Sequence, residues 1–170
     1  MEGQKGIGLM QKGNSMLNFI SESSQLAPSK QRVKSFELFH RVKLPQVFVD
    51  VICKFNGAKC KDSTFNIDGE ERVVERLLCI LDDASQDLVY GQYEISVVVA
   101  QIEERLTDDE DQVGTTILPF AVLFGGDLLC LDYRIDVEHP SVVIWDHDES
   151  DELYPVTFPV AESLTKFIDI

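Results

Sequence analysis

The chain has 170 residues, 44% of them hydrophobic and 26% charged, with 30 acidic against 15 basic side chains and a formal net charge of −15. This length fits one domain with a buried core, and the composition is that of a globular protein. The acidic excess argues against nucleic acid and anionic membranes as ligands, since their phosphates would be repelled.

The N-terminal residues 1–29 are weakly patterned, and we interpret them as an extension of a domain that spans residues 30–170. At most a short helix is predicted in the extension, from Asn14 or Ser15 towards Ser24.

Two helices are predicted next along the chain. The first begins after Pro28-Ser29 and ends by Lys43, because the residue before a proline avoids the α conformation. The second begins at Pro45 and ends at Asn56-Gly57. Asn-Gly also suits a hairpin turn, but the helical spacing of the apolar residues before it favours a helix cap. Its apolar residues share one face at helical spacing: Phe48, Val51, Ile52 and Phe55. We expect this face to pack on a sheet.

The central part of the chain predicts two strands and a third helix. Ser63–Asp68 alternates apolar and polar residues, and Val73–Leu81 is rich in β-branched types, with a helix as the alternative for the second. Gln92–Leu106 has apolar residues on one helical face, although its three consecutive valines also suit a strand. The acidic segment 108–114 is interpreted as an exposed loop.

From residue 116 onwards the pattern is a meander of strands. The predicted strands are Leu118–Phe124, Leu128–Tyr133 and Val142–Trp145, followed by an acidic loop at 146–152. A short closing helix opens with Pro159, and its apolar face is formed by Val160, Leu164, Phe167 and Ile168. Helices near both ends and strands between them predict a single α+β domain with a mostly antiparallel sheet.

The sequence Gly125-Gly126-Asp127 lies between two apolar runs and raises the alternatives of a phosphate-binding loop and a tight turn. A phosphate loop requires a helix after its glycines, and here a strand-like segment follows, without the Lys-Ser/Thr pair. Two adjacent glycines suit a two-residue hairpin turn, in which both residues take positive φ. We therefore predict a hairpin turn.

The charge is unevenly distributed along the chain. Residues 1–61 hold ten Lys/Arg and four Asp/Glu, a net of +6, whereas residues 101–154 hold fifteen Asp/Glu and two Arg, a net of −13. Scattered charge only keeps a protein in solution, but clustered charge favours a cationic partner. The expected partner-binding residues are the acidic groups of the two loops: Asp108, Asp109, Glu110, Asp111, Asp146, Asp148, Glu149, Asp151 and Glu152.

The cysteines and the apolar runs predict a cytoplasmic location. Met1–Ile20 has no continuous apolar segment of a secretory signal, and the longest apolar run, Ile117–Phe124, is eight residues long, too short to span a membrane. The four cysteines include no C-x-x-C pair, and Cys79 and Cys130 lie in apolar runs, so reduced thiols are expected.

Signals for catalysis and metal binding are weak. His147 lies among acidic residues, but these residues lack the spacing of a calcium-binding loop. A zinc site needs about three ligands with organised spacing, and the only other histidines in the sequence are His40 and His139. The sequence has no G-x-S-x-G motif, which would indicate a nucleophilic serine. Pairs of carboxylates are abundant, but in a chain this acidic they are expected by chance and do not indicate a glycosidase. Trp145 lies in an apolar strand and is expected in the core. We predict no catalytic residues, no metal and no cofactor.

Several of these motifs together resemble the SUKH superfamily, which includes fungal cell-wall-synthesis regulators and many bacterial relatives. The resemblance covers roughly residues 30–170 and rests on the order and spacing of the following positions: Leu44, Pro45, Asn56, Gly57, Gly125, Gly126, Asp127, Trp145 and His147. Ala58, where a second glycine is common, and the long acidic loop at 108–114 depart from the pattern.

The resemblance implies a binding fold without a common catalytic site. Bacterial members of the superfamily resemble immunity proteins, which neutralise a cognate toxin domain in the cytoplasm, as in contact-dependent inhibition. The resemblance and the acidic charge together predict a non-enzymatic immunity protein whose partner is a basic toxin domain, such as a nuclease. The alternative is a regulatory scaffold that binds endogenous proteins.

Overall fold

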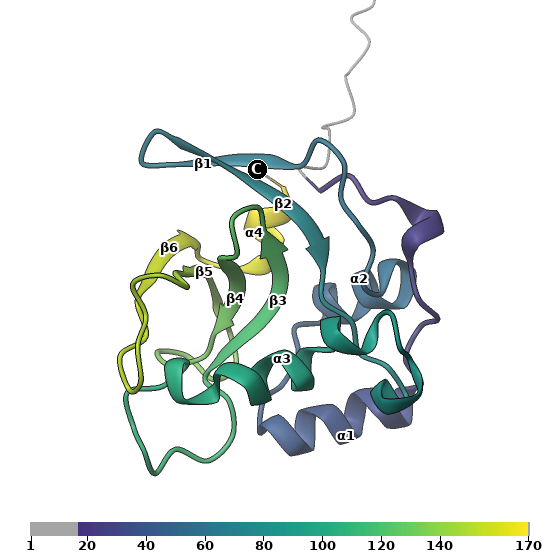
Figure 1. Cartoon of the computed structure of the whole chain (residues 1–170), viewed down its shortest axis with the longest axis horizontal. Helices are drawn as coiled ribbons and strands as arrows, with labels where there is room; N and C mark the ends of the chain where they lie inside the picture. Colours follow the sequence, from purple (N-terminus) through teal and green to yellow (C-terminus); the bar gives the residue numbers. More distant parts are fainter. Residues whose placement is uncertain (1–16, 170) are drawn as a thin grey trace, which may run out of the picture.

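Six strands form one antiparallel sheet, and their order in the sheet is their order in the chain (Figure 1). The structure is a computed structural model that describes residues 17–169. The strands are β1 (Thr64–Ile67), β2 (Glu70–Leu77), β3 (Ile117–Leu123), β4 (Leu128–Asp132), β5 (Ser141–Trp145) and β6 (Thr157–Ala161). Every neighbouring pair is antiparallel, which confirms the α+β class and the predicted meander.

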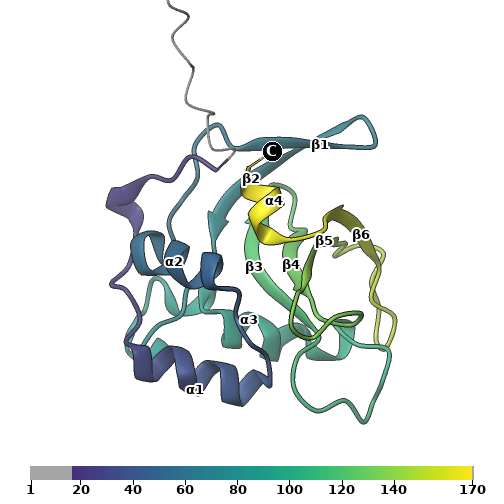
Figure 2. The same cartoon turned by 180° about the vertical axis from the view of Figure 1, so that it is seen from behind.

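The helices within the described residues lie around this sheet. They are α1 (Lys30–His40), α2 (Gln46–Phe55), α3 (Ile95–Ile102) and α4 (Leu164–Ile168), with 3₁₀ turns η1 (Ser21–Ser23), η2 (Ala84–Gln86), η3 (Gly91–Tyr93) and η4 (Glu103–Arg105). Two opposite views show α3 on one face of the sheet and α4 on the other (Figures 1 and 2). The Phe120 ring of β3 lies 6.0 Å from Phe48 of α2 and 6.4 Å from Phe167 of α4, so α2 and α4 cover the same face of β3.

Helix α2 forms where the apolar spacing predicts it. Phe48 and Ile52 are buried against the core, whereas Val51 is half-buried and Phe55 stacks on Phe19, 4.5 Å between ring centroids. Val51 and Phe55 also pack against the core, so all four residues of the predicted apolar face contribute to it. Pro45 lies one position before the first helical residue and accepts the first helical hydrogen bonds.

The strand prediction for Val73–Leu81 is confirmed in type but not in extent. β2 ends at Leu77, and Leu78 and Cys79 continue by donating backbone hydrogen bonds to Phe120 and Tyr93. The helix predicted over 92–106 is shorter, because 3₁₀ turns replace both of its ends. The carboxylate of Glu94 caps α3 by accepting from the N–H groups of its first turn.

The Gly125-Gly126 hairpin joins β3 to β4, as predicted, and no helix follows it. Both glycines lie in the left-handed region, with φ of +97° and +104°. The Leu123 N–H donates to the Asp127 carbonyl (2.9 Å), so three residues, Phe124 included, form the turn instead of the expected two. The difference arises because the Phe124 N–H bonds to the neighbouring strand β2.

The structure refines one prediction at the start of the chain and corrects one at its end. The helix expected up to Ser24 is a single 3₁₀ turn at Ser21–Ser23, and its expected start at Asn14 or Ser15 lies outside the described residues. The closing helix starts only after Ser163, whose hydroxyl caps it, because the preceding residues form the edge strand β6. Val160 therefore belongs to a strand and not to the helical face.

Cys79, Cys130 and Trp145 are buried, as the sequence predicts. All four cysteines are free, and burial raises the pKa of Cys60 to about 11 and that of Cys79 to about 12. Trp145 is 2% exposed and belongs to the core. Among residues 17–169 there is no helix with the length and apolar character that a bilayer crossing requires.

Candidate partner-binding surface

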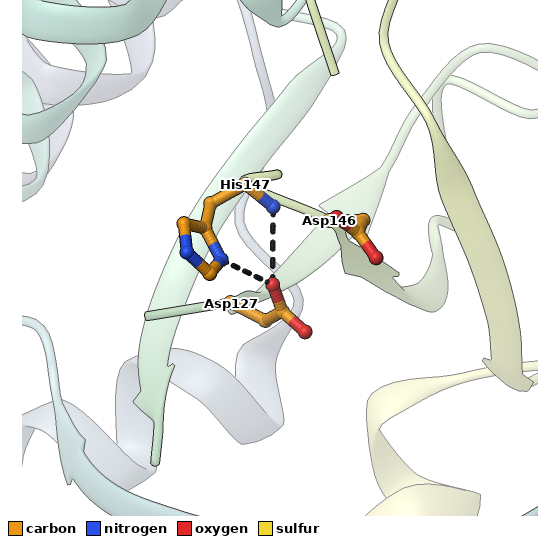
Figure 3. A group of neighbouring side chains, drawn as sticks. All are labelled: Asp127, Asp146 and His147. Carbon is orange, nitrogen blue, oxygen red and sulfur yellow. Dashed lines mark hydrogen bonds and ion pairs between the residues drawn. The ribbon is translucent and has the colours of Figure 1, made fainter. Parts of the chain in front are cut away.

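The Gly-Gly turn and the start of the acidic loop 146–152 meet at Asp127 (Figure 3). Its Oδ1 accepts a hydrogen bond from the His147 backbone N–H (3.0 Å) and lies 2.7 Å from His147 Nδ1, while Oδ2 lies 3.3 Å from Arg72 Nη1. These partners offset the cost of burying a carboxylate that is 8% exposed. A Cβ at Gly126 would lie 3.4 Å from the same imidazole ring. The turn and the loop therefore form one structural unit.

The surroundings of His147 favour its charged form. The hydrogen bond to Asp127 raises the pKa of His147, and the nearby carboxylates of Asp148 and Asp146 act in the same direction against the opposing effect of desolvation. Nε2 lies 3.2 Å from Asp148 Oδ1, so each ring nitrogen faces a carboxylate. A doubly protonated ring donates to both.

Asp127, Asp146 and His147 also offer three ligand atoms that lie within 4.8 Å of one another, which makes them a candidate metal cluster. These atoms already have partners within the protein. Asp146 Oδ1 accepts from the backbone N–H groups of Asp148 (2.9 Å) and Glu149 (2.8 Å), and Asp127 is bonded as described above. A metal ion would have to replace these hydrogen bonds, so we keep the prediction that the protein binds none.

Arg105 in η4 holds the acidic loop against the end of α3. Its Nη2 donates to the carbonyl of His147 and to that of Ser150 (2.7 Å), and its Nε donates to Ser150 as well (3.2 Å). The guanidinium lies 5.0 Å from the Trp145 ring, and Trp145 Nε1 donates back to the Arg105 carbonyl (2.9 Å). The loop is therefore fixed through its backbone carbonyls, and Asp148, Glu149, Asp151 and Glu152 are exposed at its surface.

Replacing Arg105 with lysine is expected to loosen the loop. Lysine keeps the charge but lacks the planar fork that contacts two carbonyls, so we expect a loss of about 1–2 kcal/mol in the free energy of unfolding. Amide hydrogen exchange should become faster in residues 147–153. The matched control is Arg41→Lys, at an exposed arginine. Unchanged exchange in the loop would contradict the anchoring role.

The other acidic loop is ordered by local hydrogen bonds. Thr107 Oγ1 donates to Gln112 Oε1 (2.7 Å), and Gln112 Nε2 donates to the Gly114 carbonyl (3.1 Å). Asp109 Oδ1 accepts from the Asp111 N–H at 3.0 Å. These bonds close residues 107–114 into a compact turn at the end of η4.

Both loops contribute to one hollow of about 460 Å³, which we call the acidic hollow. The backbone N–H of Leu153 donates to the Glu104 carbonyl (2.7 Å) and brings the second loop beside η4. The lining residues are Glu103, Glu104, Thr107, Asp109, Glu110, Gln112, Gly114, Glu152 and Leu153. Five carboxylates thus face one concavity, and its described lining contains no lysine or arginine.

The structure brings together only some of the predicted partner-binding residues. Asp109, Glu110 and Glu152 line the acidic hollow, whereas the other predicted residues lie outside its lining: Asp108, Asp111, Asp146, Asp148, Glu149 and Asp151. Asp146 is half-buried and serves the loop backbone. Sequence reasoning missed Glu103 and Glu104, although their place beside the 108–111 cluster at the end of a predicted helix was a usable signal.

A second junction lies at the end of α2, far from the acidic loops in the sequence. Asn56 is fully buried, and its Nδ2 donates to the carbonyls of Leu26 and Ile80, both at 2.8 Å, while its Oδ1 accepts from the Ile80 N–H (2.9 Å). Gly57 has a φ of +69°, and a Cβ there would lie 2.9 Å from the Cys79 Cβ. This Asn-Gly pair ends α2 and fastens it to the segment after β2.

One of three comparisons with known proteins found a match. A family model, SUKH_6, described as SMI1-KNR4 cell-wall, matches residues 30–168. The searches of curated proteins and of solved structures gave no match. The matched range includes α1 to α4, the whole sheet, the Asn-Gly end of α2 and the contact between Asp127 and His147. The chain therefore belongs to the SUKH superfamily, in its SMI1-KNR4 family.

Proposed function

We propose that this SUKH protein is a non-enzymatic, cytoplasmic immunity protein that binds and neutralises a cognate toxin domain through the two acidic loops. The observation that carries the proposal is the acidic hollow, in which carboxylates from separate segments converge without a basic counterpart in the described lining. Family membership supports it, because bacterial SUKH domains include toxin-immunity proteins. The binding sites proposed from the sequence are retained, with Glu103 and Glu104 added.

The charge of the surface indicates the charge of the partner. A focused negative potential raises the encounter rate with a positive surface and disfavours acidic partners. Toxin domains that act on nucleic acid hold phosphates and are therefore basic. A basic nuclease domain fits this surface best.

A regulatory scaffold is the second candidate function. The matching family is described by its cell-wall members, which supports a role with endogenous proteins instead of a toxin. Co-expression with a candidate toxin domain encoded beside this gene separates the two candidate functions. An immunity protein is expected to co-purify with that domain and suppress its toxicity, whereas a scaffold would do neither.

The acidic-loop proposal predicts how binding depends on charge. Two variants neutralise the loops by Asp→Asn and Glu→Gln changes: one at Asp108, Asp109, Glu110 and Asp111, and one at Asp146, Asp148, Glu149, Asp151 and Glu152. Because such charges steer encounter, each variant should associate with the toxin domain about tenfold more slowly at low salt, with a smaller change in dissociation. Added salt should slow the association of the parent protein with the toxin domain, and it should diminish the difference in association rate between the parent and the variants.

The matched control neutralises exposed carboxylates of the β1–β2 region and should associate as the parent does: Asp62, Asp68, Glu71 and Glu75. Association rates are measured by stopped-flow fluorescence at two ionic strengths. If neither loop variant alters the rate and the parent shows no salt effect, the acidic loops are not the binding surface.

A further inference from the structure

A second hollow, of about 330 Å³, lies beside the acidic hollow, between α1, α3 and residues 112–115. Half of its lining side chains are apolar: Phe39, Val99, Ala100, Leu106 and Val113. We call it the apolar hollow. The two hollows share Glu103, Gln112 and Gly114 in their linings, so they adjoin each other, and we call the pair the groove, with an apolar end and an acidic end.

The floor of the apolar hollow is preformed. His40 is 1% exposed, and its ring nitrogens lie 2.8 Å from Thr115 Oγ1 and 2.8 Å from Ser96 Oγ. The Thr115 N–H donates to the His40 carbonyl at 2.8 Å. Gly114 packs so closely that a Cβ there would lie 2.7 Å from the same carbonyl oxygen. A ligand that enters this hollow therefore loses little binding energy to ordering the protein.

Two apolar side chains at the rim are exposed to solvent. Phe39 is 75% exposed and Val113 is 65% exposed, on opposite elements of the apolar hollow. The Phe39 ring is held edge-on to the His40 ring, 5.0 Å between centroids. An exposed aromatic ring beside a concavity offers a large apolar area that a partner can cover.

The acidic end of the groove restricts what can occupy it. Glu103 stands at the border of the two hollows, and four more carboxylates follow within the acidic hollow. The described linings of both hollows contain no lysine or arginine. An occupant that fills the apolar end and extends along the groove is therefore stabilised if it carries positive charge next to its apolar group.

We propose that this groove binds a segment of the toxin domain in which an apolar side chain is flanked by basic residues. The apolar side chain enters the apolar hollow against Phe39 and Val113, and the basic residues lie along the carboxylates of the acidic hollow. This inference rests on the proposed function and adds to it the position and chemistry of the central contact. Affinity then comes mainly from the apolar end, and encounter rate from the acidic end.

The first test uses fluorescent peptides of lysines around a central phenylalanine. We expect the peptide to bind, to bind about tenfold more weakly when serine replaces the phenylalanine, and not to bind when glutamates replace the lysines. Binding is measured by fluorescence anisotropy at two ionic strengths. Equal binding of the serine peptide or of the glutamate peptide would overturn the proposal.

The second test changes the protein at exposed positions. The double variant Phe39→Ser, Val113→Ser should weaken peptide binding about tenfold at both ionic strengths, and Asp109→Asn, Glu110→Gln should weaken it only at low salt. The matched control is Leu38→Ser, Val137→Ser, because these residues are 72% and 68% exposed and line neither hollow. An equal loss in the control would contradict a specific groove.

The same variants separate this inference from the proposed function. If the neighbouring toxin domain co-purifies equally with the parent and with the Phe39→Ser, Val113→Ser variant, the groove proposal is wrong and the immunity function stands. If the peptides bind as expected but that toxin domain does not bind, the proposed immunity function is wrong. The groove is then still a site for a basic segment with an apolar side chain. Light scattering tests a second copy as the occupant: a dimer of the parent that Phe39→Ser, Val113→Ser dissociates would overturn the proposal.

Discussion

Replacing Asn56 with alanine is expected to lower the free energy of unfolding by about 3–4 kcal/mol. The side chain is fully buried and makes three hydrogen bonds, to the carbonyls of Leu26 and Ile80 and from the Ile80 N–H. Alanine leaves the two Ile80 groups unpaired inside the protein and opens a small cavity. Each buried group that loses its partner costs roughly 1–3 kcal/mol, which accounts for the size of the effect.

Urea unfolding followed by circular dichroism measures this loss, with Asn66→Ala as the matched control. Asn66 is exposed on β1, so the same change there should alter stability by less than about 0.5 kcal/mol. Asn56→Asp separates hydrogen bonding from packing, because it keeps the shape but directs a carboxylate at two carbonyl oxygens. It should be at least as destabilising as Asn56→Ala at neutral pH and less so in acid. Similar losses for Asn56→Ala and Asn66→Ala would contradict this role.

Acid should destabilise the protein through His40 at pH values where most carboxylates are still ionised. Burial lowers the pKa of His40 from 6.5 to about 4, and the positive charge of Arg32 acts in the same direction. The unfolded chain therefore takes up a proton before the folded chain does. Neutral His40 therefore makes its full contribution to the free energy of unfolding above pH 6.5. As the pH falls from 6.5 towards 4, the free energy of unfolding decreases by about 3 kcal/mol in total.

The variant His40→Gln removes this titration and should flatten the pH dependence of stability between pH 6.5 and 4. Its stability at pH 7 should be lower than that of the parent, because glutamine cannot reach both Ser96 and Thr115. The measured quantity is therefore the change in the free energy of unfolding with pH, and not its value at one pH. The matched control is His139→Gln, at an exposed histidine, which should keep the slope of the parent. An unchanged slope in His40→Gln would show that another group controls the acid response.

Local features of the fold could be predicted because their signals lie within a few residues. The spacing of Phe48 and Ile52 predicts α2, and two adjacent glycines predict the turn between β3 and β4. The edge strand β6 was missed because it is short and half-exposed and contains Pro159. Its pairing with β5 defines it as a strand, and that pairing has no signature in its own residues.

For the candidate partner-binding surface, the sequence predicts the negative charge but not the arrangement of the residues. The excess of acidic residues in two loops is visible in the sequence, but the convergence of Glu152 with Glu103 and Glu104 depends on tertiary contacts made by Arg105 and Leu153. The apolar hollow depends similarly on the approach of α1 to α3. Long-range contacts of this kind follow from the assembled sheet, so no window of the sequence contains them.

The placement of both acidic loops on connections between regular elements has an evolutionary consequence. One loop links η4 to β3 and the other links β5 to β6, so insertions or charge changes in either leave the strand register intact. Lengthening such a loop is inexpensive, since each doubling costs only about 0.6 kcal/mol of closure entropy. A lineage with this fold can therefore change the sequence of two surface segments when a binding partner diversifies, while the folding of the domain stays under separate selection.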